Sequence, residues 1–410
     1  MQTNWAGNHV YRAARLEEPG SVAELQELVA SHERVRALGS RHSFTDIADT
    51  DGVLVSLANL PDDVDIFEPG RSVTVGGGVL YGHVAESLQQ RGWAMANMAS
   101  LPHISVAGAV ATGTHGSGDR NGSLAAAVSA VEAVGPSGEI YRLQRGDADF
   151  AGSVVALGAL GIVTALTLDI EPSFDVRQDV FTDLPWLVVE QSFDDITGRA
   201  YSVSLFTDWT ADSVQQVWMK SRGTDSPGDL FGAVPATATL HMLRGGATES
   251  VTEQGGVTGP WHERLPHFRM AFTPSRGEEL QTEYFVPRRH AQAAFAAMRR
   301  LGPRMAPLLQ VGEIRTVAGD ELWLSGAYQE DVVGLHFTWV RDPEAVYAVL
   351  PAIEAELLPL DARPHWGKCF TASRDQLLAA YPRLTDFVAL RTKVDPGGKF
   401  GNAFLERVLG

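Results

Sequence analysis

The chain has 410 residues, of which 33 are Lys or Arg and 50 are Asp or Glu, so its formal net charge is −17. Apolar residues make up 44% and charged residues 20%, which is the composition of a globular protein of two or three domains and not of a disordered chain. The acidic balance argues against a broad nucleic-acid-binding surface, which needs clustered Lys and Arg, but it leaves room for a local basic pocket.

The single cysteine, Cys369, excludes both an intrachain disulfide and a thiolate metal cluster. His262 and His267 lie five residues apart without a ligand-spaced carboxylate, so no metal is expected. The N-terminus lacks the apolar core of a signal peptide. The longest apolar stretch, 154–168, falls short of the roughly 20 residues of a membrane helix. We therefore expect a cytoplasmic protein with no membrane partner.

The first 170 residues are rich in glycine and in short apolar runs. Ser21 and Glu24 form a capping-box pattern before an amphipathic stretch, which predicts that a helix begins here. Gly92 is placed to end a second helix over 81–91. Strands are expected at 34–38, 52–57 and 72–75.

The second half predicts a further α+β domain. Alternating apolar residues predict strands at 202–206, 282–286, 311–317 and 333–340, and helices are expected at 290–301 and 343–358. Asp342 followed by Pro343 is a favourable helix start, whereas Pro351 is expected to kink or divide that helix. Residues 223–256 are richer in Gly, Ser and Thr and are expected to form a loop.

Two glycine-rich segments can accommodate a ligand. Residues 38–44 run from a strand into a tight loop whose backbone N–H groups can form an anion nest. Residues 102–118 are mostly small, which lets the backbone lie against a flat or extended ligand. Neither segment is a dinucleotide fingerprint or a P-loop. An ordinary turn and a loop packed on a helix are the alternatives, so the two segments indicate a phosphate or cofactor cradle without specifying it.

A polar face is predicted for the sheet of the second half. Glu313 and Arg315 share one face of their strand, and His336 and Thr338 share one face of theirs, with apolar residues between them. The polar residues at 281 and 283 alternate in the same way. Such a face is either an ordinary solvated surface or, if another domain covers it, the lining of a cleft for a polyhydroxylated substrate.

A basic and aromatic cluster follows at residues 363–368. It has little helical or strand periodicity, so its lysine, Lys368, belongs either to a basic surface loop or to a pocket.

Together these segments resemble the alditol oxidases, in the vanillyl-alcohol-oxidase-like group of FAD enzymes, over essentially the whole chain. The segments that carry the resemblance are 39–43, 97–108, 112–118, 313–315, 336–339, 364–368 and 395–402. Asn-Met-Ala-Ser at 97–100 and Glu-Ile-Arg at 313–315 narrow it to alditol oxidases, whereas His-Trp-Gly-Lys at 365–368 is shared with aldonolactone oxidoreductases.

The resemblance implies an α+β, two-domain FAD-binding fold of the PCMH/VAO type, in which antiparallel sheet and helices form the C-terminal substrate domain. The expected divisions are an FAD-binding domain at 1–172, a substrate-binding cap domain at 173–394, and a C-terminal segment at 395–410 that returns to the FAD domain.

The resemblance also implies the site residues. His42 matches the histidine that carries FAD covalently, and Arg41 stands beside it where a small residue is more usual. The implied cofactor-binding residues are Leu38, Gly39, Ser40, Arg41, His42, Ser43, Ser100, Ser105, Gly108, Thr112, Gly113, Thr114, His115, Ser117 and, through its backbone, Ile162. The implied substrate-binding residues are Ser100, Glu313, Arg315, Thr338 and Lys368.

The implied activity is FAD-dependent oxidation of the terminal primary alcohol of an alditol, such as xylitol or sorbitol, with O₂ reduced to H₂O₂. Lys368 and Arg315 would stabilise the developing alkoxide, and Glu313 and His336 are the two candidate bases. The expected partners are a small polyol and O₂, and the expected state is a monomer. An aldonolactone oxidase or dehydrogenase of the same fold is the nearest alternative, and a non-catalytic flavin- or sugar-binding protein is a second.

Overall fold

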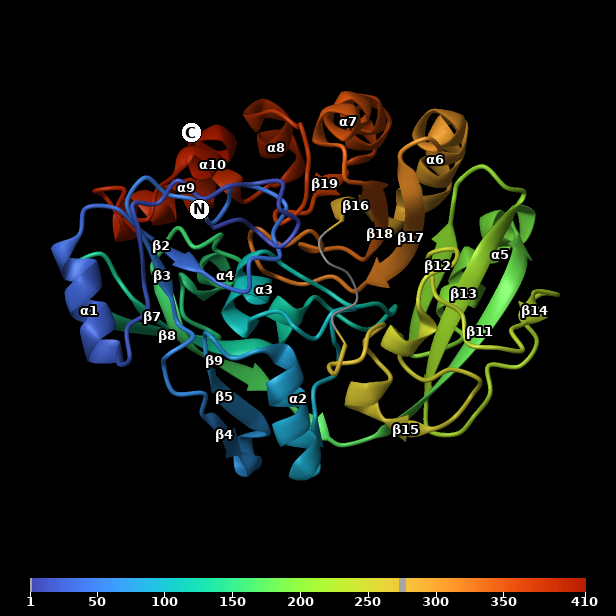
Figure 1. Ribbon diagram of the computed structural model, residues 1–410, viewed down its shortest axis with the longest axis horizontal. Helices are drawn as coiled ribbons and strands as arrows, with labels where there is room; N and C mark the ends of the chain where they lie inside the picture. The colour runs from blue at the N-terminus through green and yellow to red at the C-terminus, as the bar shows by residue number, and fades with distance from the viewer. Residues whose placement is uncertain (1, 273–277) are drawn as a thin grey trace.

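The computed structural model describes residues 2–272 and 278–410 (Figure 1). The α-helices are α1 Val22–Ser31, α2 Tyr81–Gln90, α3 Val106–Ala111, α4 Phe150–Ser153, α5 Trp186–Thr197, α6 Ala291–Met305, α7 Pro343–Leu357, α8 Arg374–Ala380, α9 Leu384–Val394 and α10 Ala403–Leu409. The strands of the first half are β1 Arg15–Glu17, β2 Val35–Leu38, β3 Val53–Ser56, β4 Val64–Phe67, β5 Ser72–Gly76, β6 Trp93–Ala94, β7 Val128–Val134, β8 Ile140–Gln144, β9 Ile162–Asp169 and β10 Glu171–Pro172. The strands of the second half are β11 Asp175–Pro185, β12 Ser202–Thr207, β13 Ser213–Arg222, β14 Val234–Pro235, β15 Gly259–Pro260, β16 Glu279–Pro287, β17 Leu309–Val317, β18 Val332–Val340 and β19 Arg363–Pro364.

The first half is built on two small sheets. Strands β1, β3 and β2 form a parallel sheet in that order, and β4, β5, β9, β7 and β8 form an antiparallel one. The helix predicted after Ser21 is confirmed as α1, and the Ser21 side chain accepts a hydrogen bond from the backbone N–H of Glu24. The strands expected at 34–38, 52–57 and 72–75 are confirmed as β2, β3 and β5. The two-sheet arrangement of an FAD domain is therefore present.

The second half is dominated by one large sheet, whose strands follow the order β14-β11-β13-β12-β17-β18-β16-β19 with β15 added beside β11. The four predicted strands are confirmed as β12, β16, β17 and β18. Helices α6 and α7 lie along one side of this sheet (Figure 1). Ile314, Leu335 and Phe337 are fully buried on that side together with helix residues such as Phe295 and Leu350. The period-two pattern thus places the apolar side chains under the helices.

Helix α7 is not divided at Pro351 but continues through it, whereas the kink that was the other expectation stays a prediction. Its inner face buries Val346, Leu350 and Ile353 against the sheet. Burying each such side chain contributes about 1.5–3 kcal/mol, which together exceeds the roughly 3 kcal/mol that an internal proline costs a helix. The loop expected at 223–256 is confirmed in the main, since it holds only the short strand β14 and one turn of 3₁₀ helix.

The C-terminal helices return to the first half (Figure 1). Leu377 of α8, Phe387 of α9 and Phe404 of α10 pack in the same core as Val84 of α2. The backbone N–H of Val35 in β2 also donates to the carbonyl of Lys399. The three-part division of the chain stays a prediction, but α8 and α9 lie before residue 395 and already pack on the first half.

Within residues 2–272 and 278–410, no helix combines the length and the hydropathy that crossing a membrane requires.

Candidate functional site

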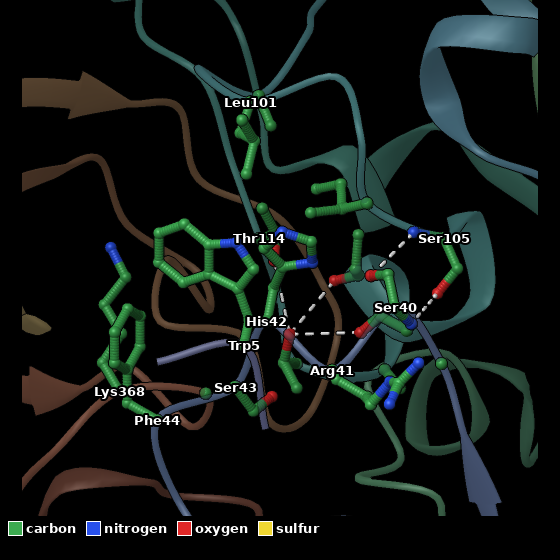
Figure 2. A pocket seen from close by; sticks show the side chains of 18 of the residues that line it. Trp5, Ser40, Arg41, His42, Ser43, Phe44, Leu101, Ser105, Thr114 and Lys368 are labelled. Atoms are coloured by element: carbon green, nitrogen blue, oxygen red, sulfur yellow. Dashed lines mark hydrogen bonds between the residues drawn. The ribbon is translucent and has the colours of Figure 1, made fainter. Parts of the chain in front are cut away.

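A cavity of about 460 Å³ extends from the glycine-rich segments of the first half to the polar face of the large sheet. Figure 2 shows part of its wall, including the 40–44 loop and Lys368. The predicted residues that line it are Leu38, Gly39, Ser40, Arg41, His42, Ser43, Ser100, Ser105, Gly108, Thr112, Thr114, His115, Glu313, Arg315, His336, Thr338 and Lys368. The structure therefore brings most of the predicted cofactor and substrate residues to one space.

The two glycine-rich segments are joined at one end of this cavity. Ser40 and Ser105 bond reciprocally, each backbone N–H facing the other hydroxyl at 3.4 and 3.1 Å (Figure 2). A Cβ added to Gly39 or Gly108 would lie 2.6 or 2.7 Å from the Ser105 hydroxyl. Side chains are thus excluded where the two segments meet, which leaves backbone to form the wall, as a flat and extended dinucleotide requires.

His42 is held in this cradle by an aromatic neighbour. The Trp5 ring stacks on it with centroids 5.3 Å apart (Figure 2), and the backbone N–H of Trp5 donates to the carbonyl of Arg41. Burial lowers the pKa of His42 to about 4, so the imidazole is neutral. Its Nδ1 is buried and finds no hydrogen-bond partner among the described residues. A neutral imidazole with an unused buried nitrogen fits the attachment of a group there. Arg41 itself has a left-handed backbone, with φ of 64°.

The polar sheet face is covered and not solvated, which decides between the two alternatives that the sequence left open. Glu283 on β16 pairs with His336 on β18, and His336 pairs with Glu313 on β17, so the three form one row across the sheet. Glu313, Arg315, His336 and Thr338 are all less than 8% exposed. The face is therefore the lining of an enclosed site.

Glu283 is the hub of this lining. Its Oε2 accepts from Lys368 Nζ at 2.6 Å, and its Oε1 accepts from Arg315 Nη2 at 2.8 Å. His115 Nε2 lies 3.1 Å from the same Oε1. Burial opposes ionisation, but the positive charges of Lys368 and Arg315 hold the pKa of Glu283 well below its usual range. The carboxylate is therefore ionised and fixes both cations.

A second carboxylate, Glu313, lies on the other side of Arg315. Its Oε1 is 2.8 Å from His267 Nε2, and its Oε2 is 3.6 Å from Arg315 Nε. Burial again opposes ionisation, but Arg315 and His267 lower the pKa of Glu313, so this carboxylate is also charged. Arg315 additionally donates to the Ser100 hydroxyl at 3.3 Å. Two carboxylates and one guanidinium thus alternate along the wall.

Hydrogen bonds define the tautomer of His336. Its Nδ1 accepts from Lys368 Nζ at 2.6 Å, so the ring proton belongs on Nε2, which lies 3.1 Å from the Thr338 hydroxyl. Burial, and then the charge of Lys368, lowers the pKa of His336 to about 4. Burial likewise lowers the pKa of Lys368, against the opposing charge of Glu283. The site therefore offers a neutral imidazole in contact with an ammonium group.

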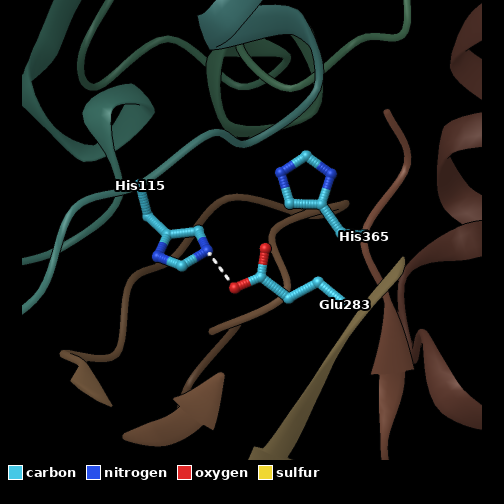
Figure 3. A group of neighbouring side chains, drawn as sticks. All are labelled: His115, Glu283 and His365. Atoms are coloured by element: carbon cyan, nitrogen blue, oxygen red, sulfur yellow. Dashed lines mark ion pairs between the residues drawn. The ribbon is translucent and has the colours of Figure 1, made fainter. Parts of the chain in front are cut away.

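His115, Glu283 and His365 group closely enough to resemble a metal centre (Figure 3). However, both Glu283 oxygens already accept hydrogen bonds from cations, which would repel a divalent ion. We therefore assign the group to the ion-pair network of the cavity, and the expectation of no metal stays a prediction.

Three predicted cofactor residues do not line the cavity. Gly113 lies between the lining residues 112 and 114, with φ of 69°. Ser117 is buried and donates to the carbonyl of Val203. Ile162 lies in the core of the first half, while its neighbours at 161 and 163 line the wall. Cys369 follows Lys368, but it points into the core of the second half and is 1% exposed.

Several lining residues were missed by the sequence analysis. Glu283 was recognised as alternating but was not placed with the other polar residues, although its strand period would have put it there. Gly77 and Gly78 line the cofactor end, and the glycine run 76–78 could have indicated a close approach of backbone. His267 and Trp5 come from irregular segments without a local signal.

Residues 13–144 match the FAD binding domain family, and residues 271–408 match the D-arabinono-1,4-lactone oxidase family. The structure is similar to cholesterol oxidase from B. sterolicum, with a TM-score of 0.80 over 100% of this chain and 96% of that one, at 15% identity, which shows the shared fold alone. Fold and cradle therefore define the class as a two-domain FAD-binding oxidoreductase.

Two relatives narrow the class. The chain is 51% identical to the alditol oxidase of a Streptomyces species, over 99% of this chain and 98% of that protein. It is 30% identical to the L-gulono-1,4-lactone dehydrogenase of Mycobacterium tuberculosis, over 100% of this chain and 99% of that one. The chain belongs to the alditol oxidase family and is related to the aldonolactone oxidoreductases.

Proposed function

We propose that this protein oxidises the terminal primary alcohol of an alditol, such as xylitol or sorbitol, to the aldehyde. The observation that supports this most directly is that the polar sheet face is covered. Its residues Glu313, Arg315, His336 and Thr338 line the same cavity as Lys368 and the cradle of the first half. Alternating carboxylates and cations can accept from and donate to the hydroxyls of a neutral polyol, which an apolar pocket could not do.

FAD fits the cradle described above, and when bound it supplies the acceptor for the substrate hydride and passes the electrons to O₂, giving H₂O₂. The segments 38–43, 105–108 and 112–115 would hold it, with His42 as the covalent attachment point. The neutral state of His42 supports this assignment, because a protonated imidazole has no lone pair to form the bond.

The side chains of the protein accept the alcohol proton and stabilise the alkoxide. Lys368 Nζ donates to His336 Nδ1, so Nδ1 would take the alcohol proton as Lys368 turns this N–H from the imidazole to the alkoxide oxygen, which it then stabilises. We favour His336 over Glu313 as the proton acceptor, because Glu313 is ionised against Arg315 and better suited to bind a hydroxyl. A positioned base of this kind typically contributes about 10²–10⁴-fold in rate.

The decisive experiment is H₂O₂ release from the purified protein with xylitol, sorbitol, L-gulono-lactone and L-galactono-lactone. We expect kcat/KM to be highest with the alditols. A higher value with the lactones would replace the proposal with the activity of the aldonolactone relatives. If none of these compounds bleached the flavin absorption under anaerobic conditions, the protein would instead be a binding protein.

Covalent attachment has its own test. Acid-precipitated protein should remain yellow, and His42→Ala should release all flavin to the supernatant. Flavin that appears wholly in the supernatant of the unmodified protein would reject the bond. The cytoplasmic location, the monomeric state and the domain limits at 172 and 394 are further proposals, testable by fractionation, light scattering and limited proteolysis.

A further inference from the structure

A lysine lies buried behind the polar face without lining the cavity. Lys220, on β13, is 1% exposed. Its ammonium group has three acceptors, which are the carbonyl of Leu265 at 2.5 Å, the carbonyl of Pro266 at 3.0 Å and His267 Nδ1 at 3.0 Å. All three N–H donors are therefore used, which is the full capacity of a lysine ammonium. A cation so enclosed needs an explanation, because burying a charge is expensive.

His267 connects this lysine to the cavity. Because Lys220 donates to Nδ1, the ring proton belongs on Nε2, which lies 2.8 Å from Glu313 Oε1. Burial, and then the charge of Lys220, lowers the pKa of His267 to about 4, so the ring is neutral. The three side chains form a directed chain of donors that ends on a carboxylate of the substrate face.

We propose that Lys220 and His267 form a relay that fixes the orientation of the Glu313 carboxylate, so that Lys220 is a positioning residue for polyol binding although it does not touch the cavity. The inference rests on the proposed function, in which Glu313 binds a substrate hydroxyl. With Oε1 occupied by His267, Oε2 is left to face Arg315 and the substrate.

Beyond the relay itself, His336 faces Glu313 from the paired strand β18 and lowers the pKa of that carboxyl. Arg315 is the remaining charged neighbour that acts on both Lys220 and His267. His267 also contacts the Ser204 hydroxyl at 3.4 Å and packs edge-on against the rings of Phe206 and Trp218. The ring is thus clamped in position, and the charge state of Lys220 decides how strongly Nδ1 is held. Burial lowers the pKa of Lys220 to about 7, within reach of a titration.

The first test reads the relay without any substrate. Protein labelled with ¹⁵N-histidine should show His267 as the Nε2–H tautomer at pH 6, with assignment by loss of the signal in His267→Gln. The Nδ1 resonance should move as the pH rises through about 7, and Lys220→Met should give the shifted value already at pH 6. The relay would be overturned if the Nδ1 resonance stayed unchanged from pH 5.5 to 9 and was also unchanged in Lys220→Met. If Lys220→Met does not fold, the titration of the wild-type protein alone decides whether the relay exists.

The second test reads the effect on binding. Lys220→Met should raise the KM for xylitol about tenfold and change kcat by less than threefold, and this effect should disappear in a Glu313→Gln background. Lys399→Met is the matched control, because Lys399 Nζ donates to the carbonyl of Val29 away from the cavity, and its kinetics should be unchanged. An equal loss for Lys220→Met in both backgrounds would show that Lys220 acts elsewhere.

Two histidine substitutions separate orientation from packing. The amide nitrogen of His267→Gln can replace Nε2–H as the donor to Glu313, whereas that of His267→Asn reaches only the position of Nδ1. We expect His267→Gln to keep kcat/KM within about threefold and His267→Asn to lose about tenfold or more. Equal losses in both would contradict the relay. If wild-type protein oxidises no alditol, the proposed function fails, while the tautomer measurement still decides the relay.

Discussion

Replacing Glu283 by Gln removes the charge that holds Lys368 and Arg315 together while keeping the shape of the side chain. The carboxylate is 1% exposed and accepts from these cations at 2.6 and 2.8 Å. A hydrogen bond to a charged group contributes about 1.5–3 kcal/mol, and breaking a buried ion pair by removing one partner costs about 3–5 kcal/mol. We expect Glu283→Gln to lose about 3–5 kcal/mol of unfolding free energy, measured by urea denaturation followed by tryptophan fluorescence.

The same substitution should reach the chemistry. Without the carboxylate, burial and Arg315 act unopposed by Glu283 on Lys368 and lower its pKa further, which favours a neutral amine that cannot stabilise an alkoxide. Loss of one such preorganised group typically lowers kcat by about 10²-fold or more. As the pH rises, kcat should then begin to fall at a lower pH than in the unmodified protein, because the pKa of Lys368 has been lowered.

A double-mutant cycle tests whether Glu283 holds Lys368 and Arg315 together. Lys368→Met in the Glu283→Gln background removes the uncompensated cation, so the double variant should be more stable than the sum of the single losses by about 1–3 kcal/mol. The partly exposed pair of Asp149 and Lys393 is the control, and Asp149→Asn should change stability by less than about 1 kcal/mol. A Glu283→Gln loss as small as that of the control, or strict additivity with Lys368→Met, would show that Glu283 is not the hub.

Three further predictions concern the cradle, the cysteine and the buried histidines. A Cβ on Gly77 would lie 2.2 Å from a backbone carbonyl, so Gly77→Ala should lower the free energy of unfolding by about 1–3 kcal/mol and lower the fraction of bound FAD. Gly397→Ala is the control, because open space surrounds its Cβ, and it should change neither quantity. Equal effects of the two substitutions would contradict the cradle. Burial raises the pKa of Cys369 to about 11, so a disulfide reagent at pH 8 should react at least about 10²-fold more slowly with native than with unfolded protein. A rapid reaction of the native protein would mean that the thiol is exposed. His267 and His336 have a pKa of about 4 in the fold against 6.5 unfolded, so the unfolded chain binds more protons between these values and stability falls as pH drops through this range. Each should cost about 2 kcal/mol at pH 5, and His267→Gln should show a smaller drop in Tm from pH 7.5 to 5 than the unmodified protein; identical drops would refute the assignment.

The parts of the fold that could be predicted from the sequence are those set by local periodicity. Glu313 and Arg315 alternate with buried apolar residues over one strand, and His336 and Thr338 do so over another, which is enough to place all four on one face. Helix starts were equally local, since Ser21 caps α1 through a bond to a residue three positions on. The composition of the cofactor cradle was also recognisable, but its ligand came from the family resemblance.

The hub could not be predicted because its partners are remote in the sequence. Glu283 meets Arg315 across two strand pairings, Lys368 from a segment 85 residues away, and His115 from the other half of the chain. A period-two pattern assigns a face to Glu283, but no local pattern says which strand lies beside which, so its neighbours stayed unknown. Lys220 is a stronger case, since a lysine in a strand is ordinarily expected at the surface and here it is almost fully buried.

The net charge of −17 gives the wrong sign for the site, and the reason lies in distance and burial. Exposed carboxylates farther than about 8 Å from the cavity are screened by physiological salt, whereas groups in contact inside it are not. Within the wall, the carboxylates of Glu283 and Glu313 are balanced by Arg315 and Lys368, and an ammonium on Lys220 adds a positive excess. An alkoxide formed beside Lys368 therefore enters a neutral to positive environment, although the protein as a whole is strongly acidic.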